Sequence, residues 1–177
     1  CQQKNRNVDD SSRKPRLLVE IEKEDSLRLL NRNIEFDSSA RSFYRKALFL
    51  KYNNYRFRGI VQNLKETIKR DTCFWPAYKL LGSLYFEALR PSEAYYYIDK
   101  YYKYDSSDLK IKYYLGRSST YVSAFNRANR LLSELLENKK FGNDDEVLIG
   151  LGINELKRGR YKIAQEYLIQ SFSEVEM

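Results

Sequence analysis

The sequence predicts an all-α fold. Only three of the 177 residues are proline and seven are glycine, so the residues that break helices are scarce, whereas Leu, Lys, Glu, Arg and Tyr are plentiful. Apolar residues make up 42% of the chain and charged residues 32%, a balance typical of a folded, water-exposed protein. A repeat of 34 residues, described below, indicates how the helices are organised.

Residues 1–16 begin with Cys1, and Val8 is the only aliphatic residue among the polar residues that follow. Such a segment cannot bury enough apolar area to offset its ordering entropy, so it is predicted to be a flexible tether. This start resembles that of mature bacterial lipoproteins, in which a signal peptide is cut before a cysteine that then carries a diacylglycerol. The resemblance implies a lipid anchor at Cys1 and a place at a bacterial membrane, on the periplasmic face or the cell surface. The alternative is a fragment boundary that happens to fall at a cysteine.

Residues 17–40 are predicted to contain a helix. Leu27, Leu30 and Ile34 recur there at helical spacing. We expect this helix to shield the first of the repeats that follow it in the chain.

The remainder of the chain repeats. A spacing of aromatic-x-x-Leu-Gly-x-x-Tyr is followed by Ala-x-x-x-large, and its small residues recur with a constant interval of twelve positions. The glycines and their alanines are Gly82 with Ala94, Gly116 with Ala128 and Gly152 with Ala164. This pattern resembles the tetratricopeptide repeat (TPR), a unit of two antiparallel helices.

The resemblance implies a right-handed superhelical solenoid with repeats at about 41–74, 75–108, 109–142 and 145–177. Glycine and alanine would let the two helices of a unit approach closely, because bulky residues there would force them apart. The first unit is degenerate, with the bulky Leu48 and Ile60 where small residues are expected, so we expect looser or shifted packing there.

Six tyrosines lie between Tyr95 and Tyr104. On a helix, most of them share one broad stripe with Ala94 and Ile98, so we expect them to pack between repeats and not to stack on a ligand. Tyr96 lies off the stripe, and Tyr104 is expected to close the helix against the following unit.

The resemblance also implies that first helices of successive repeats line a concave, peptide-binding groove. Advancing by one period gives a ladder of basic and aromatic residues that could take an acidic or carboxylate-bearing segment. Its members are Arg45, Phe49, Tyr52, Lys79, Ser83, Phe86, Tyr113, Arg117, Thr120 and Tyr121. The alternative is an ordinary solvated helix face. The ladder lacks the Lys/Asn combination of the carboxylate-clamp subtype, which argues against a chaperone-tail ligand.

The same stripe in the last repeat is apolar, at Ile149, Ile153 and Leu156. The helix over 147–156 is therefore expected to be buried all round. We expect the last repeat to contact a partner, a second copy in a homodimer, or the N-terminal segment of the chain.

Histidine is absent, which removes the commonest general base and metal ligand. Cys73 is expected to be a buried apolar residue without a disulfide partner. No run of about 18 apolar residues predicts a membrane-spanning helix. We therefore expect no enzyme activity, cofactor or metal site.

The favoured function is a lipid-anchored scaffold for protein or peptide partners, with an accessory lipoprotein of an outer-membrane protein assembly complex as a narrower version. RNA binding is the alternative that the net charge of +8 suggests. It is disfavoured because a lipidated protein outside the cytoplasm rarely meets nucleic acid, and acidic partners or anionic membranes explain the charge as well.

Overall fold

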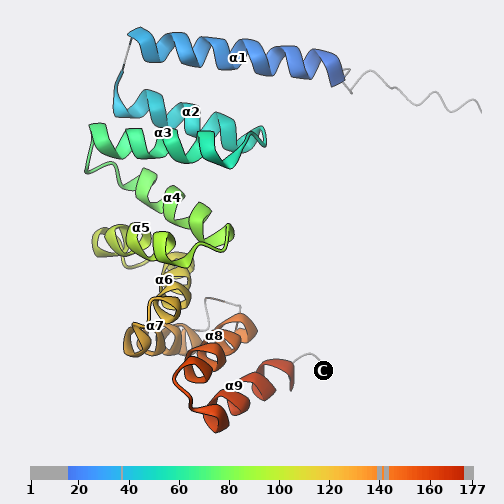
Figure 1. Cartoon of the computed structure of the whole chain (residues 1–177), viewed down its shortest axis with the longest axis vertical. Helices are drawn as coiled ribbons and strands as arrows, with labels where there is room; N and C mark the ends of the chain where they lie inside the picture. The colour runs from blue at the N-terminus through green and yellow to red at the C-terminus, as the bar shows by residue number, and fades with distance from the viewer. Residues whose placement is uncertain (1–15, 37, 139–140, 142–143, 174–177) are drawn as a thin grey trace, which may run out of the picture. The chain divides into compact units, whose positions relative to one another are not determined.

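Helices make up the secondary structure of the chain wherever it is described. The computed structural model describes residues 16–36, 38–138, 141 and 144–173. These ranges contain nine helices and no strand (Figure 1), so the all-α prediction is confirmed for them. The helices are α1 (Arg16–Phe36), α2 (Ala40–Tyr52), α3 (Phe57–Arg70), α4 (Trp75–Glu87), α5 (Pro91–Tyr104), α6 (Leu109–Tyr121), α7 (Phe125–Glu137), α8 (Asp144–Lys157) and α9 (Tyr161–Ser173).

The chain divides into two compact units, Cys1–Thr67 and Ile68–Met177. The N-terminal unit contains α1, α2 and most of α3, and the C-terminal unit contains α4 to α9. The expected repeat boundaries remain a prediction, although each of the four ranges covers two successive helices, with α2 and α8 beginning one residue earlier, at Ala40 and Asp144. Cys1 and the expected tether up to residue 15 lie outside the described residues.

In the N-terminal unit, α1 lies against α2, and the core is formed by small and aliphatic side chains of α2 and α3. Ala47 and Leu64 are fully buried, and Leu50 and Ile60 nearly so. A cavity of about 430 Å³ remains among α1, α2 and α3, bordered by Leu27, Phe43 and Gly59 among others. The looser packing expected of the degenerate copy remains a prediction.

The C-terminal unit is a stack of three helix pairs. Each helix contacts the next along the chain, from α4 to α9, and the first helices of successive pairs also meet, α4 with α6 and α6 with α8. Each pair therefore covers a face that its neighbour could not bury alone, as in a repeat solenoid.

Glycines set the spacing within these pairs, as expected. In each pair the glycine of the first helix faces a large aliphatic side chain of the second, sixteen residues later. A methyl group on the glycine would overlap that side chain in every case. The facing residues are Gly82 with Ile98, Gly116 with Leu132 and Gly152 with Leu168. The alanines Ala94, Ala128 and Ala164 are buried. The predicted role of the small residues is confirmed.

The first helix of each pair, α2 included, ends in the same type of turn. After α4, the Leu89 amide donates to the Phe86 carbonyl (3.0 Å) and the Arg90 amide to the Tyr85 carbonyl (2.9 Å), the two bonds of a Schellman motif. One residue of each turn adopts a positive φ. These residues are Asn54 (56°), Leu89 (56°), Ser123 (62°) and Gly159 (76°).

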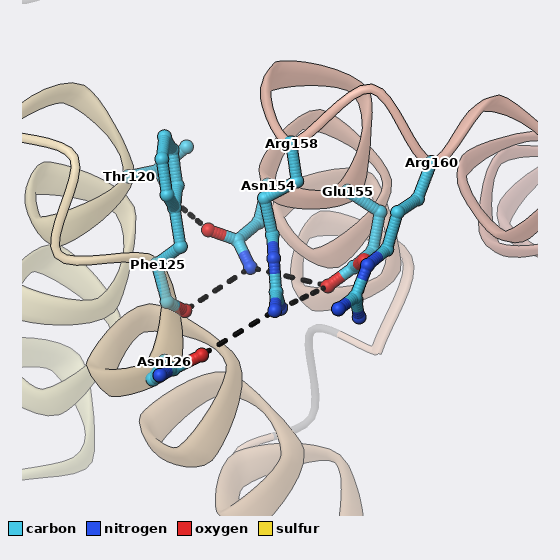
Figure 2. A network of polar contacts seen from close by, with 7 residues as sticks. All are labelled: Thr120, Phe125, Asn126, Asn154, Glu155, Arg158 and Arg160. Carbon is cyan, nitrogen blue, oxygen red and sulfur yellow. Dashed lines mark hydrogen bonds and ion pairs between the residues drawn. The ribbon is translucent and has the colours of Figure 1, made fainter.

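A buried polar network ties α8 to the pair before it (Figure 2). The Asn154 side chain, which is fully buried, accepts a hydrogen bond from the Thr120 hydroxyl (3.1 Å) and donates to the Phe125 carbonyl (3.2 Å). Glu155, only 3% exposed, pairs with Arg158 (3.0 Å) and Arg160 (3.5 Å). Thr120 is therefore a core residue, and its expected place in the groove wall was wrong.

The tyrosine cluster of α5 is mainly structural. Tyr101 is buried with Ile98, and Tyr97 stacks on the buried Tyr85 of α4 (centroids 5.7 Å apart), whereas Tyr96 is exposed, as expected. The placement of Tyr104 was wrong. Its ring stacks on Trp75 of the same helix pair (4.9 Å) and is otherwise exposed, so it does not seal α5 against the following unit.

Cys73 lies in the turn before α4 and is exposed, so the expectation of a buried apolar cysteine was wrong. Its amide donates to the Asp71 side chain (2.8 Å) in a polar turn. The position has no helical periodicity that would turn the thiol inward.

None of the described helices combines the length and the apolar character that a membrane crossing needs.

Candidate functional site

A cavity of about 660 Å³ opens in the C-terminal unit where the end of α4, the start of α5, α6 and the start of α8 meet. Most of its lining is apolar or aromatic, with two charged groups. The residues of this aromatic pocket are Phe86, Leu89, Pro91, Tyr113, Tyr114, Arg117, Tyr121 and Glu146. Four of them lie on α6, at positions that a helix brings to one side.

Three rings pack together in the pocket wall. Phe86 of α4 stacks on Tyr114 of α6 with ring centroids 4.0 Å apart, and meets Tyr113 edge-on at 6.2 Å. Tyr113 and Tyr114 are buried by these contacts. Such stacked and edge-on ring pairs stabilise the wall.

Leu89 and Tyr121 are the exposed large hydrophobic side chains of the lining. They are 88% and 46% exposed, in contrast to the buried rings of the wall. Their surface is what a ligand would remove from water.

Arg117 is the central polar group. Its Nη1 donates to the Tyr113 hydroxyl (2.7 Å), and its guanidinium lies 5.7 Å from the centre of that ring. The Nε of Arg117 is buried and has no hydrogen-bond partner among the described residues. Gly150 of α8 makes room for the arginine, since a methyl group there would lie 2.8 Å from its Cδ.

The electrostatics of the pocket favour a neutral tyrosine beside a cation. Burial raises the pKa of Tyr113, and Glu146 adds to this increase, while the positive charge of Arg117 works against it. The hydroxyl of Tyr113 therefore stays protonated at neutral pH and links Arg117 to the wall.

Cations lie over each tyrosine of the pocket. Besides Arg117 over Tyr113, the Lys110 ammonium lies 5.5 Å from the ring centre of Tyr114, and the Lys157 ammonium 4.8 Å from that of Tyr121. Glu146 is the single carboxylate of the lining. The pocket region is therefore apolar in its wall and positive around it.

Four of the expected groove residues meet in this pocket: Phe86, Tyr113, Arg117 and Tyr121. Lys79 and Ser83, on α4, are not part of its lining. The Lys79 ammonium pairs with Asp108 (2.5 Å), which caps the start of α6, and lies 5.6 Å from the centre of the Tyr101 ring. The hydrogen bond to Asp108 raises the pKa of Lys79, so this charge is held by the fold.

The remaining three ladder residues, Arg45, Phe49 and Tyr52, lie on α2 of the N-terminal unit. Arg45 and Tyr52 are exposed, and Phe49 is half-buried beside Tyr55, with ring centroids 6.1 Å apart. Their part in a groove remains a prediction.

The expectation that residues 147–156 are buried all round was wrong. Ile149 and Ile153 are half-buried, and Leu156 is 47% exposed, whereas Asn154 and Glu155 are buried. Exposed apolar side chains instead gather on α9, at Tyr161, Ile163, Ile169 and Phe172. The interface expected at Ile149, Ile153 and Leu156 remains a prediction.

Sequence reasoning missed Leu89, Pro91, Tyr114 and Glu146 in the pocket. Leu89 and Pro91 lie in and just after a turn, where no periodicity marks a side chain as functional. In the part of the chain that the structure describes, no group of three or more Cys, Asp or Glu side chains could hold a metal ion.

No protein-family model matches the sequence, and no curated protein matches it either. Solved structures do. YrrB, described as a TPR protein with an unusual peptide-binding site, matches with a TM-score of 0.74 and 15% identity over 89% of this chain and 80% of its own.

A MamA fragment from Desulfovibrio magneticus RS-1 matches with a TM-score of 0.68 and 14% identity over 89% of this chain and 88% of its own. MamA of AMB-1 matches with a TM-score of 0.69 and 12% identity, over 85% of this chain and 81% of its own. At these identities the likeness concerns the fold, which is that of a TPR solenoid, as the sequence pattern predicted.

Proposed function

We propose that the protein is a scaffold that binds a segment of another protein, and that the aromatic pocket holds an apolar side chain of that segment next to a carboxylate. The observation that carries the proposal is the pocket itself: an apolar wall with Arg117 at its centre and further cations around it. TPR solenoids in general bind proteins, so the fold supports the broader half of the proposal.

The size and lining of the pocket support a bound side chain. A volume of about 660 Å³ lies within the range of small-ligand sites, which are mostly apolar with a few convergent polar groups. The solved structure of YrrB is described as having a peptide-binding site, which supports a peptide as the kind of ligand.

The charges support an acidic segment. In the lining itself Arg117 and Glu146 balance each other, and the first turn of α8 adds Asp144 and Asp145, but Lys110 and Lys157 lie over tyrosines of the lining and the whole chain carries a net charge of +8. Arg117 lines the pocket and is only half-buried, so its guanidinium can donate a charge-assisted hydrogen bond to a carboxylate. A basic segment would be repelled by the same groups.

Replacing Arg117 with glutamine should weaken binding of a fluorescein-labelled peptide with the core Glu-Leu-Phe-Glu about tenfold, because a charge-assisted hydrogen bond is lost. Fluorescence anisotropy gives the Kd. Peptides with Lys in place of Glu, or Ser in place of Leu and Phe, should bind more weakly to the unmodified protein. Binding should also weaken with added salt.

Arg130→Gln is the matched control. It removes the same charge from the exposed side of α7, where Arg130 lies 4.0 Å from Glu134, and it should leave the Kd unchanged. Equal Kd values for the parent and Arg117→Gln, or no binding of the acidic peptide by the parent, would contradict the proposal.

We also propose the membrane setting expected from the sequence, with a lipid anchor at Cys1. Replacing Cys1 with alanine should move the protein from the membrane pellet to the supernatant after ultracentrifugation, because acyl chains would supply the membrane affinity. A variant that still sediments with membranes would refute the anchor. The narrower version of the proposal is an accessory lipoprotein of an outer-membrane protein assembly complex. Only the analogy of fold and overall organisation supports it.

A further inference from the structure

We infer that Leu89 is a ligand-contact residue, held in a strained turn so that its side chain forms part of the mouth of the aromatic pocket. The inference rests on the proposed function and adds a specificity-determining residue to it.

The backbone of Leu89 is unusual for its residue type. Its φ of 56° lies in the left-handed region, which a bulky L-residue avoids because Cβ crowds the carbonyl oxygen. The same turn position is held elsewhere by Asn54, Ser123 and Gly159, which are short residues. Glycine, and sometimes asparagine, is the usual residue at this point of a Schellman motif.

The fold gives no reason for a leucine there. Both hydrogen bonds of the turn are made by backbone groups, so any residue that tolerates the conformation could form them. The side chain is 88% exposed and contributes little to the core. An exposed leucine alone needs no explanation, but a strained residue calls for one.

The pocket gives a reason. Leu89 lines it together with Phe86 and with Pro91 at the start of α5. Because the tyrosines of the wall are already buried, Leu89 and Tyr121 are the apolar side chains with the most surface left for a ligand to cover. At this position the left-handed turn and the pocket coincide.

The test compares stability with binding. Leu89→Asn should raise the melting temperature (Tm) by about 2 to 4 °C, because asparagine tolerates the turn. The same variant should weaken binding of the Glu-Leu-Phe-Glu peptide about tenfold, because the contact area of one leucine is lost. Leu89→Met should keep the Kd within about twofold of the parent, since a methionine preserves the apolar contact.

Ser123→Gly is the matched control, because Ser123 holds the equivalent turn after α6 and does not line the pocket. It should raise Tm and leave the Kd unchanged. If Leu89→Asn binds as the parent does while Arg117→Gln binds weakly, the inference is wrong and the proposed function stands. An unchanged or lower Tm for Leu89→Asn would show that the left-handed conformation of Leu89 is not strained. If the parent binds no acidic peptide, both the proposed function and the inference fail.

Discussion

Replacing Gly82 with alanine should lower the free energy of unfolding by about 2 to 3 kcal/mol. The added methyl group would overlap Ile98 and lie 3.1 Å from the Ile98 backbone nitrogen, so the strain cannot be relieved by rotating a side chain alone. The α4 and α5 helices would have to separate, and the loss would exceed the gain in helix propensity. Urea denaturation followed by circular dichroism measures the change.

Gly59→Ala is the control for this substitution. Gly59 is also a helix residue, but a methyl group there would meet only Leu50, at an ordinary contact distance of 3.6 Å. We expect unchanged stability or a gain of roughly 0.5 kcal/mol from helix propensity. Equal losses at Gly82 and Gly59 would show that close helix approach is not what the repeat glycines provide.

Glu155→Ala should lower the free energy of unfolding by about 3 kcal/mol and Tm by roughly 6 to 12 °C. The carboxylate is 3% exposed and holds Arg158 and Arg160, so its removal leaves positive charge unpaired at the start of α9. Its carboxylate also contacts the Asn154 amide (3.4 Å), which joins α8 to α6 (Figure 2). Thermal unfolding by circular dichroism measures the loss.

Glu134→Ala provides the comparison, because Glu134 pairs with Lys112 (3.0 Å) but is 45% exposed at its side chain. Exposed pairs contribute about 0 to 1 kcal/mol, so its loss should be small. Similar Tm values for the two variants would mean that the Asn154–Glu155 network adds no more than a surface ion pair.

The network also shows a limit of sequence reasoning. Asn154 and Glu155 lie in an apolar stretch, and nothing in their spacing tells a buried polar pair from an exposed one. Their burial is tolerated because partners are supplied: Arg158 and Arg160 are close to Glu155 in the chain, but Thr120 and Phe125 reach Asn154 only through the approach of separate helices.

The sequence by itself determined the all-α class and the register of the helix pairs. The interval of twelve residues between Gly82 and Ala94 recurs because the two helices of every pair approach closely, and only small residues fit where they face each other. The spacing of residues along the chain was therefore enough to predict the fold class and the register, and the structure places the repeat glycines and alanines as expected.

The tertiary structure alone decided the pocket. Phe86, Arg117 and Glu146 come from α4, α6 and α8, and they meet because three helix pairs stack. Lys79 has the same helical position as other ladder residues, yet its ammonium pairs with Asp108 at the start of α6, and Lys79 is not part of the pocket lining. Periodicity fixes the face on which a side chain begins, but the end of a long charged side chain goes to its best partner, which only the packed helices provide.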